Sequence, residues 1–335
     1  MPAQGPGSGQ DVVTFTPPGG HEADLLSPPP DGPNGKVLNE PRRVRATTKP
    51  RASDGIVRSV GVTVTLLAVV ILGFVGYLYF LSGVQEARAQ TTLYARLQGE
   101  LANAVAPTGP QIPGHPAAPA SLAAAPGDPV ALLDIPAIGV RNAVVVEGTS
   151  PENLTLGPGH LRNSPLPGQT GISVLFGRRS TFGAPFGDLP QLRKGDLITT
   201  TTSQGQARYL VISVAASSKP VPFSEIPNQI LLVTADSRIA PAHYVEVEAK
   251  LLSSPFPESG YLPTVGPAEV ALGRDSYALI PAMAWAIALA AAAVLGSLAA
   301  AKWARWPAWI VTVPVILVIV WNLYESFSAL LPNLY

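Results

Sequence analysis

The chain has 335 residues with 22 basic and 22 acidic side chains, so its formal net charge is zero, and it contains no cysteine. Zero net charge gives no reason to expect nucleic acid as a partner. The lack of cysteine excludes disulfides, thiolate metal sites and cysteine nucleophiles within this chain. Only 13% of the residues are charged whereas 47% are hydrophobic, which indicates membrane-spanning segments.

Residues 1–55 are rich in proline and glycine, as in PPGG, SPPP and DGPNG, and hold few large apolar side chains. A segment of this composition cannot bury enough apolar surface to fold. We therefore expect a disordered tail, in which His21 is a solvated side chain and not a ligand.

Three apolar stretches, residues 56–82, 277–301 and 308–331, are long enough to cross a bilayer, which takes roughly 20 residues. The first stretch follows a long tail and has no small-residue cleavage site, so we predict an uncleaved anchor. The second stretch is rich in alanine and glycine, which allow close approach of partner helices within the membrane.

Basic residues predict the orientation of these spans. Two of them, Lys302 and Arg305, lie between the second and third stretches, and six others precede or open the first stretch. The positive-inside rule places both regions in the cytoplasm. We expect a multi-pass plasma-membrane protein with a cytoplasmic N-terminus and an extracytoplasmic region over residues 83–276. The six residues near the first stretch are Arg42, Arg43, Arg45, Lys49, Arg51 and Arg58.

Residues 83–106 carry an apolar stripe in which Leu93, Leu97 and Leu101 recur every fourth residue. This spacing predicts a helix that continues outward from the membrane and packs on the neighbouring domain or on another helix. A coiled-coil dimer is the alternative. Residues 107–129 are rich in proline and alanine and read as a semi-extended linker.

Residues 130–252 change to short apolar runs separated by turn residues, and we count eight candidate strands. A hairpin is expected where SQGQ joins DLITTTT to ARYLVISV. Eight short strands without a strong internal helix predict a mainly β fold, a closed or nearly closed barrel. Residues 253–276 form a second linker to the membrane. The candidate strands are ALLDI, AVVVE, a short one at NLTL, ISVLFG, DLITTTT, ARYLVISV, QILLVTA and HYVEVEAKL.

The runs ALLDIPAIGV, VVVEGTSPENLTLGPGH, LPGQTGISVLFGRRSTFGAPFGDLPQLRKGD and ILLVTADS occur in this order between residues 130 and 252. Together they resemble the sortases, in particular the actinobacterial type. The resemblance implies an extracytoplasmic transpeptidase domain, built as an eight-stranded β-barrel and tethered by membrane spans. No cofactor or metal is implied.

The resemblance also implies which positions carry the chemistry: a cysteine nucleophile, a histidine acid or base, and an arginine for the oxyanion. In this sequence the cysteine position is Ala235, the histidine position is Arg178, and the arginine position falls near His243. Alanine has no nucleophilic atom, and a guanidinium stays protonated and cannot act as a general base. We therefore expect no catalytic residues at these degenerate positions.

Other groups offer weak replacements. Thr234 is the nearest hydroxyl but should point to the opposite face of its strand from Ala235, and His160 reads as a structural turn residue. Arg178 and Arg179 are expected at the mouth of the groove, where Arg178 would grip a carboxylate or phosphate. Alternatively Arg178 is solvated and Arg179 forms a structural ion pair.

These observations predict a membrane-anchored sortase-like protein of the cell surface that lacks transpeptidase activity. It would bind or scaffold a surface protein, a peptide or a cell-wall component. One alternative is an active transpeptidase or hydrolase with a nucleophile other than cysteine. Another is a structural subunit of a membrane complex, held by membrane-helix partners.

Overall fold

The computed structural model describes residues 52–110, 123–217, 228–239, 241–302 and 305–335. The predicted tail over residues 1–51, including His21, lies outside the described residues, as does the centre of the predicted linker at residues 111–122. The chain divides into a unit Met1–Ile56 and a unit Val57–Tyr335. The second unit contains the barrel and most of the helical residues, and the description below concerns its contents.

The first apolar stretch forms helix α1 (Ala52–Gly76), which continues through one π-helical turn (η1, Tyr77–Leu81) into helix α2 (Ser82–Ala102). The chain then returns to two further apolar helices, α3 (Leu279–Lys302) and α4 (Arg305–Ala329). Within the described residues, three helices are thus long and apolar enough to cross a membrane, in agreement with the three predicted stretches.

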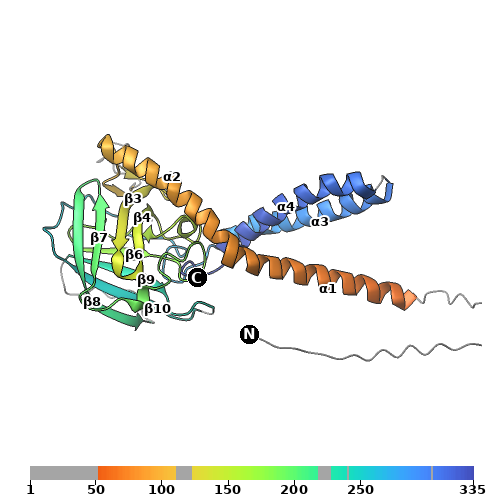
Figure 1. The fold of residues 1–335 in the computed structure, drawn as a ribbon, viewed down its shortest axis with the longest axis horizontal. Helices are drawn as coiled ribbons and strands as arrows, with labels where there is room; N and C mark the ends of the chain where they lie inside the picture. The colour runs from red at the N-terminus through yellow and green to blue at the C-terminus, as the bar shows by residue number, and fades with distance from the viewer. Residues whose placement is uncertain (1–51, 111–122, 218–227, 240, 303–304) are drawn as a thin grey trace, which may run out of the picture. The chain divides into compact units, whose positions relative to one another are not determined.

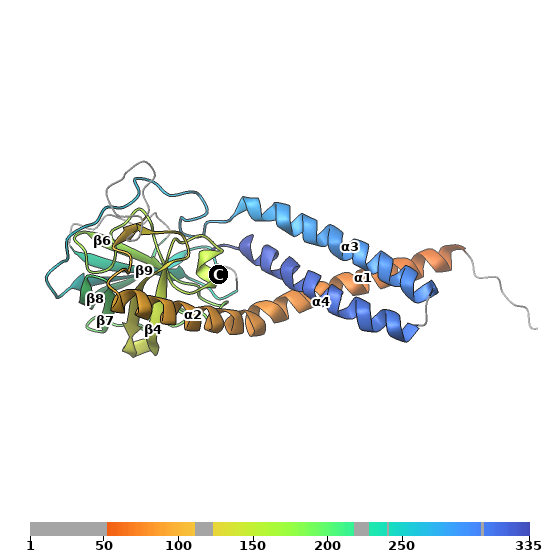
Figure 2. The same cartoon turned by 90° about the horizontal axis from the view of Figure 1, so that it is seen from above.

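Helices α3 and α4 lie side by side (Figure 2). Their approach is close at Gly296, where an added Cβ would lie 3.2 Å from Cγ2 of Thr312. A small residue at this position lets the two backbones pack tightly, as is common between membrane helices. The predicted small-residue face therefore packs, at least here, on the neighbouring helix of the same chain.

The extramembrane region forms a closed eight-stranded barrel with the order β10-β8-β7-β3-β4-β5-β6-β9 (Figure 1). Most neighbours are antiparallel, while β4–β5 and β6–β9 are parallel. The predicted mainly β fold is confirmed, as is the hairpin between β7 and β8. The strands are β3 (Pro129–Ile135), β4 (Val140–Glu147), β5 (Gly159–His160), β6 (Ile172–Phe176), β7 (Leu197–Thr202), β8 (Gly205–Ser217), β9 (Gln229–Ala235) and β10 (Tyr244–Leu251). Two further short strands, β1 (Gly109–Pro110) and β2 (Ala123–Ala124), pair outside the barrel.

One predicted strand is wrong. The run NLTL forms the 3₁₀ turn η4 (Asn153–Thr155), and the third strand of the barrel is the two-residue β5 that follows it. Backbone bonds from Leu154 to Ser150 and from Leu156 to Asn153 close this turn. Its apolar residues are too few for their spacing to separate a turn from a short strand.

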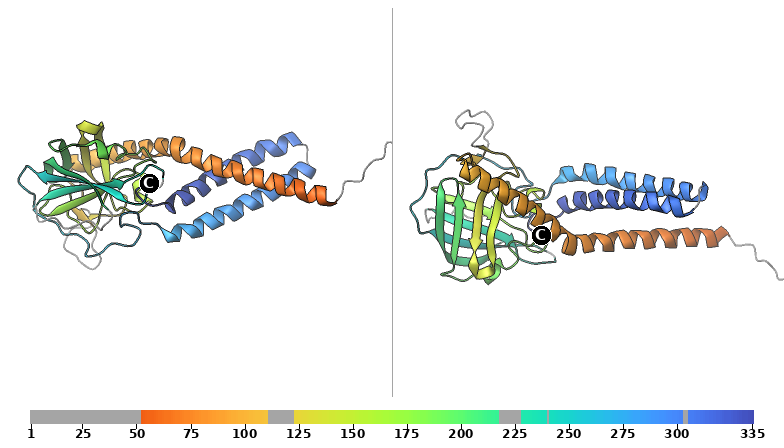
Figure 3. Two further views of the ribbon diagram at one scale, coloured as in Figure 1. Left: turned by 90° about the horizontal axis from the view of Figure 1, so that it is seen from below. Right: turned by 45° about the horizontal axis from the view of Figure 1, so that its top comes forward.

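Helix α2 packs on the outer side of the barrel (Figure 3). Leu97 is fully buried and clusters with Val144 of β4, and Leu93 and Leu101 border the same cluster. The side chain of Gln90 fastens the helix further. Its Oε1 accepts the amide of Val144 at 2.7 Å and its Nε2 donates to the Val144 carbonyl at 3.0 Å. The predicted leucine stripe therefore does pack on the neighbouring domain.

Strand β9 is buried on both faces. Ile230 and Leu232 point into the barrel core, while Leu231, Val233 and Ala235 belong to a second apolar cluster. This second cluster also contains Phe176 of β6, so it covers the outer face of β6 and β9. We call it the outer cluster, and it underlies the candidate site. Its buried members are Leu154, Val174, Phe176, Leu231, Val233, Ala235, Tyr244 and Leu334.

Candidate functional site

The ends of β6 and β9 bring the predicted degenerate positions close together. The two strands run parallel with Phe176 opposite Val233, and Ala235 is paired with Tyr244 at the start of β10. The loop after β6 is fastened to β9, because the Gly177 amide donates to the Val233 carbonyl at 3.0 Å. Positions 178, 235 and 243 therefore lie at one end of the barrel, and we call this region the cleft, after the groove that the sequence predicts there.

Ala235 is fully buried in the outer cluster, where it offers only a methyl group. The hydroxyl of the preceding Thr234 is also buried and donates to the Gly177 carbonyl at 2.9 Å. Because successive strand residues point to opposite faces, Thr234 does not replace a nucleophile at position 235. The end of β9 thus presents no nucleophilic side chain to the cleft.

The position of Arg178 differs from both sequence interpretations, because this side chain is neither solvated nor at a groove mouth. It is fully buried. Its Nε donates to the Leu154 carbonyl at 3.1 Å and its Nη2 to the Pro151 carbonyl at 2.7 Å. Its Nη1 donates to Oγ1 of Thr181 at 3.2 Å, and the guanidinium lies 4.7 Å from the centre of the Phe182 ring.

Burial lowers the pKa of Arg178 to about 9, because desolvation disfavours the charged form. Among the described residues no carboxylate forms an ion pair with this guanidinium. Backbone carbonyls of the turn at residues 151–154 hold the charge instead. The observed contacts give Arg178 a structural role, namely to fix that turn against the loop after β6.

Arg179 is partly buried, and its Nη1 donates to the Ala235 carbonyl at 2.9 Å. Its Nε is buried and has no hydrogen-bond partner. Burial, together with the nearby charge of Arg238, lowers the pKa of Arg179. Asp188 forms an ion pair with Arg238 at 3.0 Å. Of the two predicted ligand-binding arginines, Arg179 therefore has fewer side-chain nitrogens that are hydrogen-bonded within the protein.

His243 is exposed, and the bonds around it are made by the backbone. The Asp236 amide donates to the His243 carbonyl at 3.0 Å, and the Ala242 amide donates to the Asp236 carboxylate at 3.2 Å. These bonds close the turn between β9 and β10. They supply no catalytic pairing between the imidazole and the carboxylate.

Sequence reasoning treated His160 as a turn residue, but it lies in strand β5 within a buried polar network. Its Nδ1 lies 2.9 Å from Oε2 of Glu147, and its Nε2 lies 3.2 Å from Oγ of Ser164. These three groups are in the order of a hydrolytic triad. Their detailed bonding determines whether they can act as one.

The bonding within this network is that of a structural brace. The Ser164 hydroxyl donates to the Leu161 carbonyl at 2.7 Å and accepts the Val174 amide at 3.1 Å. Nε2 of His160 also lies 3.0 Å from the Pro165 carbonyl. Both ring nitrogens therefore face oxygen acceptors, and neither is free to remove a proton from serine.

An apolar cavity of about 990 Å³ adjoins the outer cluster. Ile172, Val174 and Phe176 of β6 form one wall, and residues 258–272 of the chain leading to α3 form another. Tyr244 extends the lining toward the cleft. Glu258 is the one ionisable carboxylate in a mostly apolar lining. The cavity is of the size that holds a small ligand or a short peptide segment.

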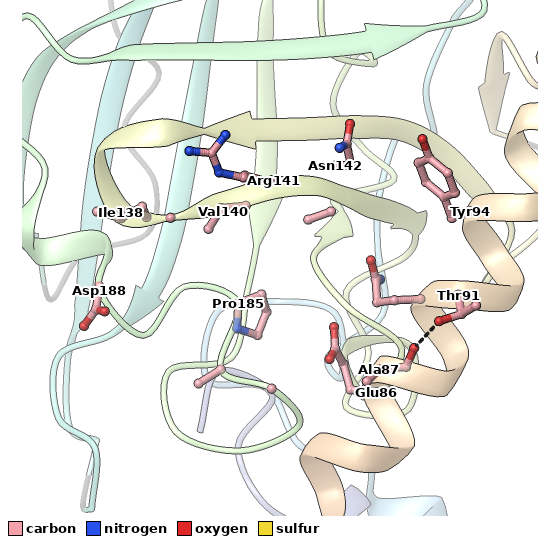
Figure 4. A pocket seen from close by; sticks show the side chains of 15 residues that line it. Glu86, Ala87, Thr91, Tyr94, Ile138, Val140, Arg141, Asn142, Pro185 and Asp188 are labelled. Carbon is pink, nitrogen blue, oxygen red and sulfur yellow. Dashed lines mark hydrogen bonds between the residues drawn. The ribbon is translucent and has the colours of Figure 1, made fainter.

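A second cavity of about 760 Å³ lies between helix α2 and the hairpin of β3 and β4. Figure 4 shows Glu86 and Tyr94 projecting from α2, and Arg141 and Asn142 on the hairpin. None of the predicted degenerate positions lines this cavity. We therefore assign it no part in the candidate site.

Comparison with known proteins gives the family of the barrel. Residues 133–245 match the family model described as the sortase domain. Sortase D of Bacillus subtilis (strain 168) is 32% identical over 93 residues, which cover 28% of this chain and 45% of that protein. The chain thus spans less than half the length of this curated relative.

Solved structures of sortases are similar as well. Sortase E from Streptomyces avermitilis is 32% identical, with 38% of this chain and 91% of that chain covered and a TM-score of 0.34. Sortase E1 from Streptomyces coelicolor, solved with a tripeptide in the active site, is 28% identical; 39% of this chain and 92% of that chain are covered, with a TM-score of 0.34. The Clostridium perfringens sortase D5 transpeptidase is 21% identical, with 50% of this chain and 99% of that chain covered and a TM-score of 0.39.

Proposed function

Since the barrel of this chain belongs to the sortase family, we propose that the protein is a membrane-anchored binding or scaffolding module without transpeptidase activity. The observation that carries the proposal is the buried methyl group of Ala235 at the end of β9. Arg178, at the position of the family's histidine, is committed to carbonyl groups of its own chain. Neither of these two positions offers a nucleophile or a general base, which supports the proposal.

We further propose that the barrel lies outside the cytoplasm. Strand β10 leads into α3, and the residues after α4 return to the barrel, where Asn333 donates to the Thr149 carbonyl at 2.8 Å. The start of α3 and the end of α4 thus both lie on the side of the barrel. Lys302 and Arg305 lie at the turn between these helices, and the positive-inside rule assigns that turn to the cytoplasm.

The cavity beside β6 is the proposed binding site. Its lining offers apolar side chains and two tyrosines, Tyr244 and Tyr261, with a single carboxylate. Such a surface suits an extended, mostly apolar peptide segment of a surface protein, in which alternate side chains fill the cavity. A charged cell-wall fragment would find no opposite charge among the lining side chains except Glu258.

The first experiment tests for catalysis. The full chain, reconstituted in lipid nanodiscs, is incubated with a library of sorting-signal peptides and an amine acceptor, and products are followed by mass spectrometry. We expect neither cleavage nor transpeptidation. Cleavage that persists after removal of contaminating proteases, and that is lost in Ser164→Ala, would instead support the hydrolase with a non-cysteine nucleophile.

The second experiment tests the binding site. Crosslinking on intact membranes compares the native chain with Ile172→Lys, which places a charge in the cavity, and with Leu197→Lys, which makes a similar change at an exposed position of β7. We expect capture of a surface protein to be lost only with Ile172→Lys. Equal capture by all three proteins would remove the cavity from the proposal.

A further inference from the structure

The segment Leu331–Tyr335, with the sequence LPNLY, follows helix α4 and enters the cleft. We propose that this segment is a tethered internal ligand, which occupies the cleft at the ends of β6 and β9 and must leave before another ligand can enter there. Occupancy of the cleft by this segment does not depend on whether the barrel is catalytically active.

Asn333 anchors the segment through specific bonds to the barrel side. It is fully buried, and its Nδ2 donates to the carbonyls of Thr149 at 2.8 Å and Val270 at 2.9 Å. Its backbone amide donates to the Gly273 carbonyl at 2.9 Å. A side-chain amide that satisfies two carbonyls from different parts of the chain fixes the position of the segment.

Leu334 lies in the same apolar cluster as Ala235, the residue at the expected nucleophile position. It is fully buried in the outer cluster, together with Phe176 and Ala235. Its carbonyl accepts the backbone amide of Arg179 at 3.0 Å, so the segment pairs with the loop that follows β6. The side chains of Ala235 and Leu334 are both apolar, so burying them costs no side-chain hydrogen bond.

The buried Arg178 contacts the loop that holds the segment. Its Nη1 donates to Oγ1 of Thr181, which directs the hydrogen of that hydroxyl away from the guanidinium. The same hydroxyl donates to the Tyr335 carbonyl at 2.7 Å. The ring hydroxyl of Tyr335 lies 3.0 Å from that of Tyr79, near the end of the first span. Arg178 therefore supports the loop that receives the segment.

Tethering strengthens this occupancy. A segment that leaves helix α4 only a few residues before the cleft is present there at an effective concentration on the order of millimolar. A free peptide with the same contacts competes poorly against it. Displacement therefore needs either a partner with additional contacts or a movement of α4.

The absence of cysteine permits a direct test on the full chain in membrane vesicles, using a membrane-impermeant maleimide. Ala235→Cys places a thiol in the outer cluster, to which Leu334 also belongs, and Ile239→Cys places a reference thiol at a position that is 79% exposed. We expect Ala235→Cys to react more slowly than the reference by at least about tenfold, as a docked segment protects what it covers. Equal rates would overturn the proposal.

A substitution in the segment then shows what provides the protection. In the Ala235→Cys background, Leu334→Asp should raise the labelling rate toward that of the reference, and Asn333→Ala should do so as a milder change. Leu252→Asp repeats the leucine-to-aspartate change at a position that is 55% exposed and should have no effect. Protection that survives both segment variants would show that something else covers the cleft.

Rescue in trans completes the test. The peptide LLPNLY, at a concentration on the order of millimolar, should restore slow labelling to the Leu334→Asp variant. The peptide LLPNDY should not. Failure of LLPNLY to protect would contradict recognition of the segment by the cleft. Because labelling reads occupancy alone, peptide cleavage in the earlier assay would overturn the proposed function and leave this result standing.

Discussion

Replacing Arg178 tests whether the buried guanidinium is a structural element. Arg178→Met keeps an apolar stem of similar length, whereas Arg178→Ala leaves a cavity as well. Both variants remove the donors to the carbonyls of Leu154 and Pro151, and each unpaired acceptor costs about 1–3 kcal/mol. Both also remove the cost of burying a charge, which the fall of the Arg178 pKa from its ordinary value to about 9 sets at about 5 kcal/mol.

These two contributions nearly cancel, so Arg178→Met should change the free energy of unfolding by less than about 2 kcal/mol. The cavity left by alanine adds a further cost of about 2–4 kcal/mol. Arg178→Ala should therefore be the less stable variant by that difference. Denaturant unfolding of the full chain in detergent micelles, followed by near-ultraviolet circular dichroism, measures both values.

The pH dependence provides a second measurement of the same burial. The folded-state pKa of Arg178, about 9, lies below the unfolded value, so the folded state binds fewer protons between these two values. The stability of the native chain relative to Arg178→Met should therefore rise with pH, by about 2 kcal/mol between pH 8 and pH 10.5. A flat difference would show that the guanidinium remains solvated. An Arg178→Ala variant whose free energy of unfolding lies within about 0.5 kcal/mol of the native value would lead to the same conclusion.

Two further substitutions test the supports of the site. Gln90→Ala removes the bonds between α2 and the Val144 backbone and should cost about 1–3 kcal/mol of unfolding free energy, whereas Gln98→Ala, on the exposed face of the helix, should cost less than about 0.5 kcal/mol. Equal losses would show that the helix is not fastened there. His160→Ala leaves the buried carboxylate of Glu147 without its closest partner and should cost about 3–5 kcal/mol, measured by the same unfolding experiment. A stable His160→Ala variant would contradict the structural reading of that network.

Much of the architecture follows from patterns that the sequence displays locally. The alternation in Val245, Val247 and Ala249 predicts a strand with one buried face; β10 buries these three residues, but Glu246 on the opposite face is buried as well. The prediction of the three spans needs only their length and hydropathy. The prediction of α2 needs only leucines that repeat about every four residues. Each of these signals is contained within one element, so no knowledge of distant contacts is needed.

The site was harder to predict because its contacts join distant segments. The resemblance puts Arg178 at the family's histidine position and predicts it at the groove mouth, whereas the structure buries it. Its partners are the carbonyls of Pro151 and Leu154, and Leu154 lies in the run NLTL, for which the sequence predicts a short strand. Residues 331–335 likewise carry no local pattern that reveals their destination. Leu334 becomes a cleft residue only because α4 returns the chain to the barrel.

The loop after β6 touches the end of the first membrane helix. The Phe182 amide donates to the Ser82 hydroxyl at 2.9 Å, and the rings of Tyr77 and Phe182 meet edge to face with centres 6.4 Å apart. On the proposed topology, these contacts place the loop after β6, and with it the cleft, at the membrane end of the barrel. On that topology, we expect a ligand that reaches this end of the barrel to be a segment anchored in the same membrane.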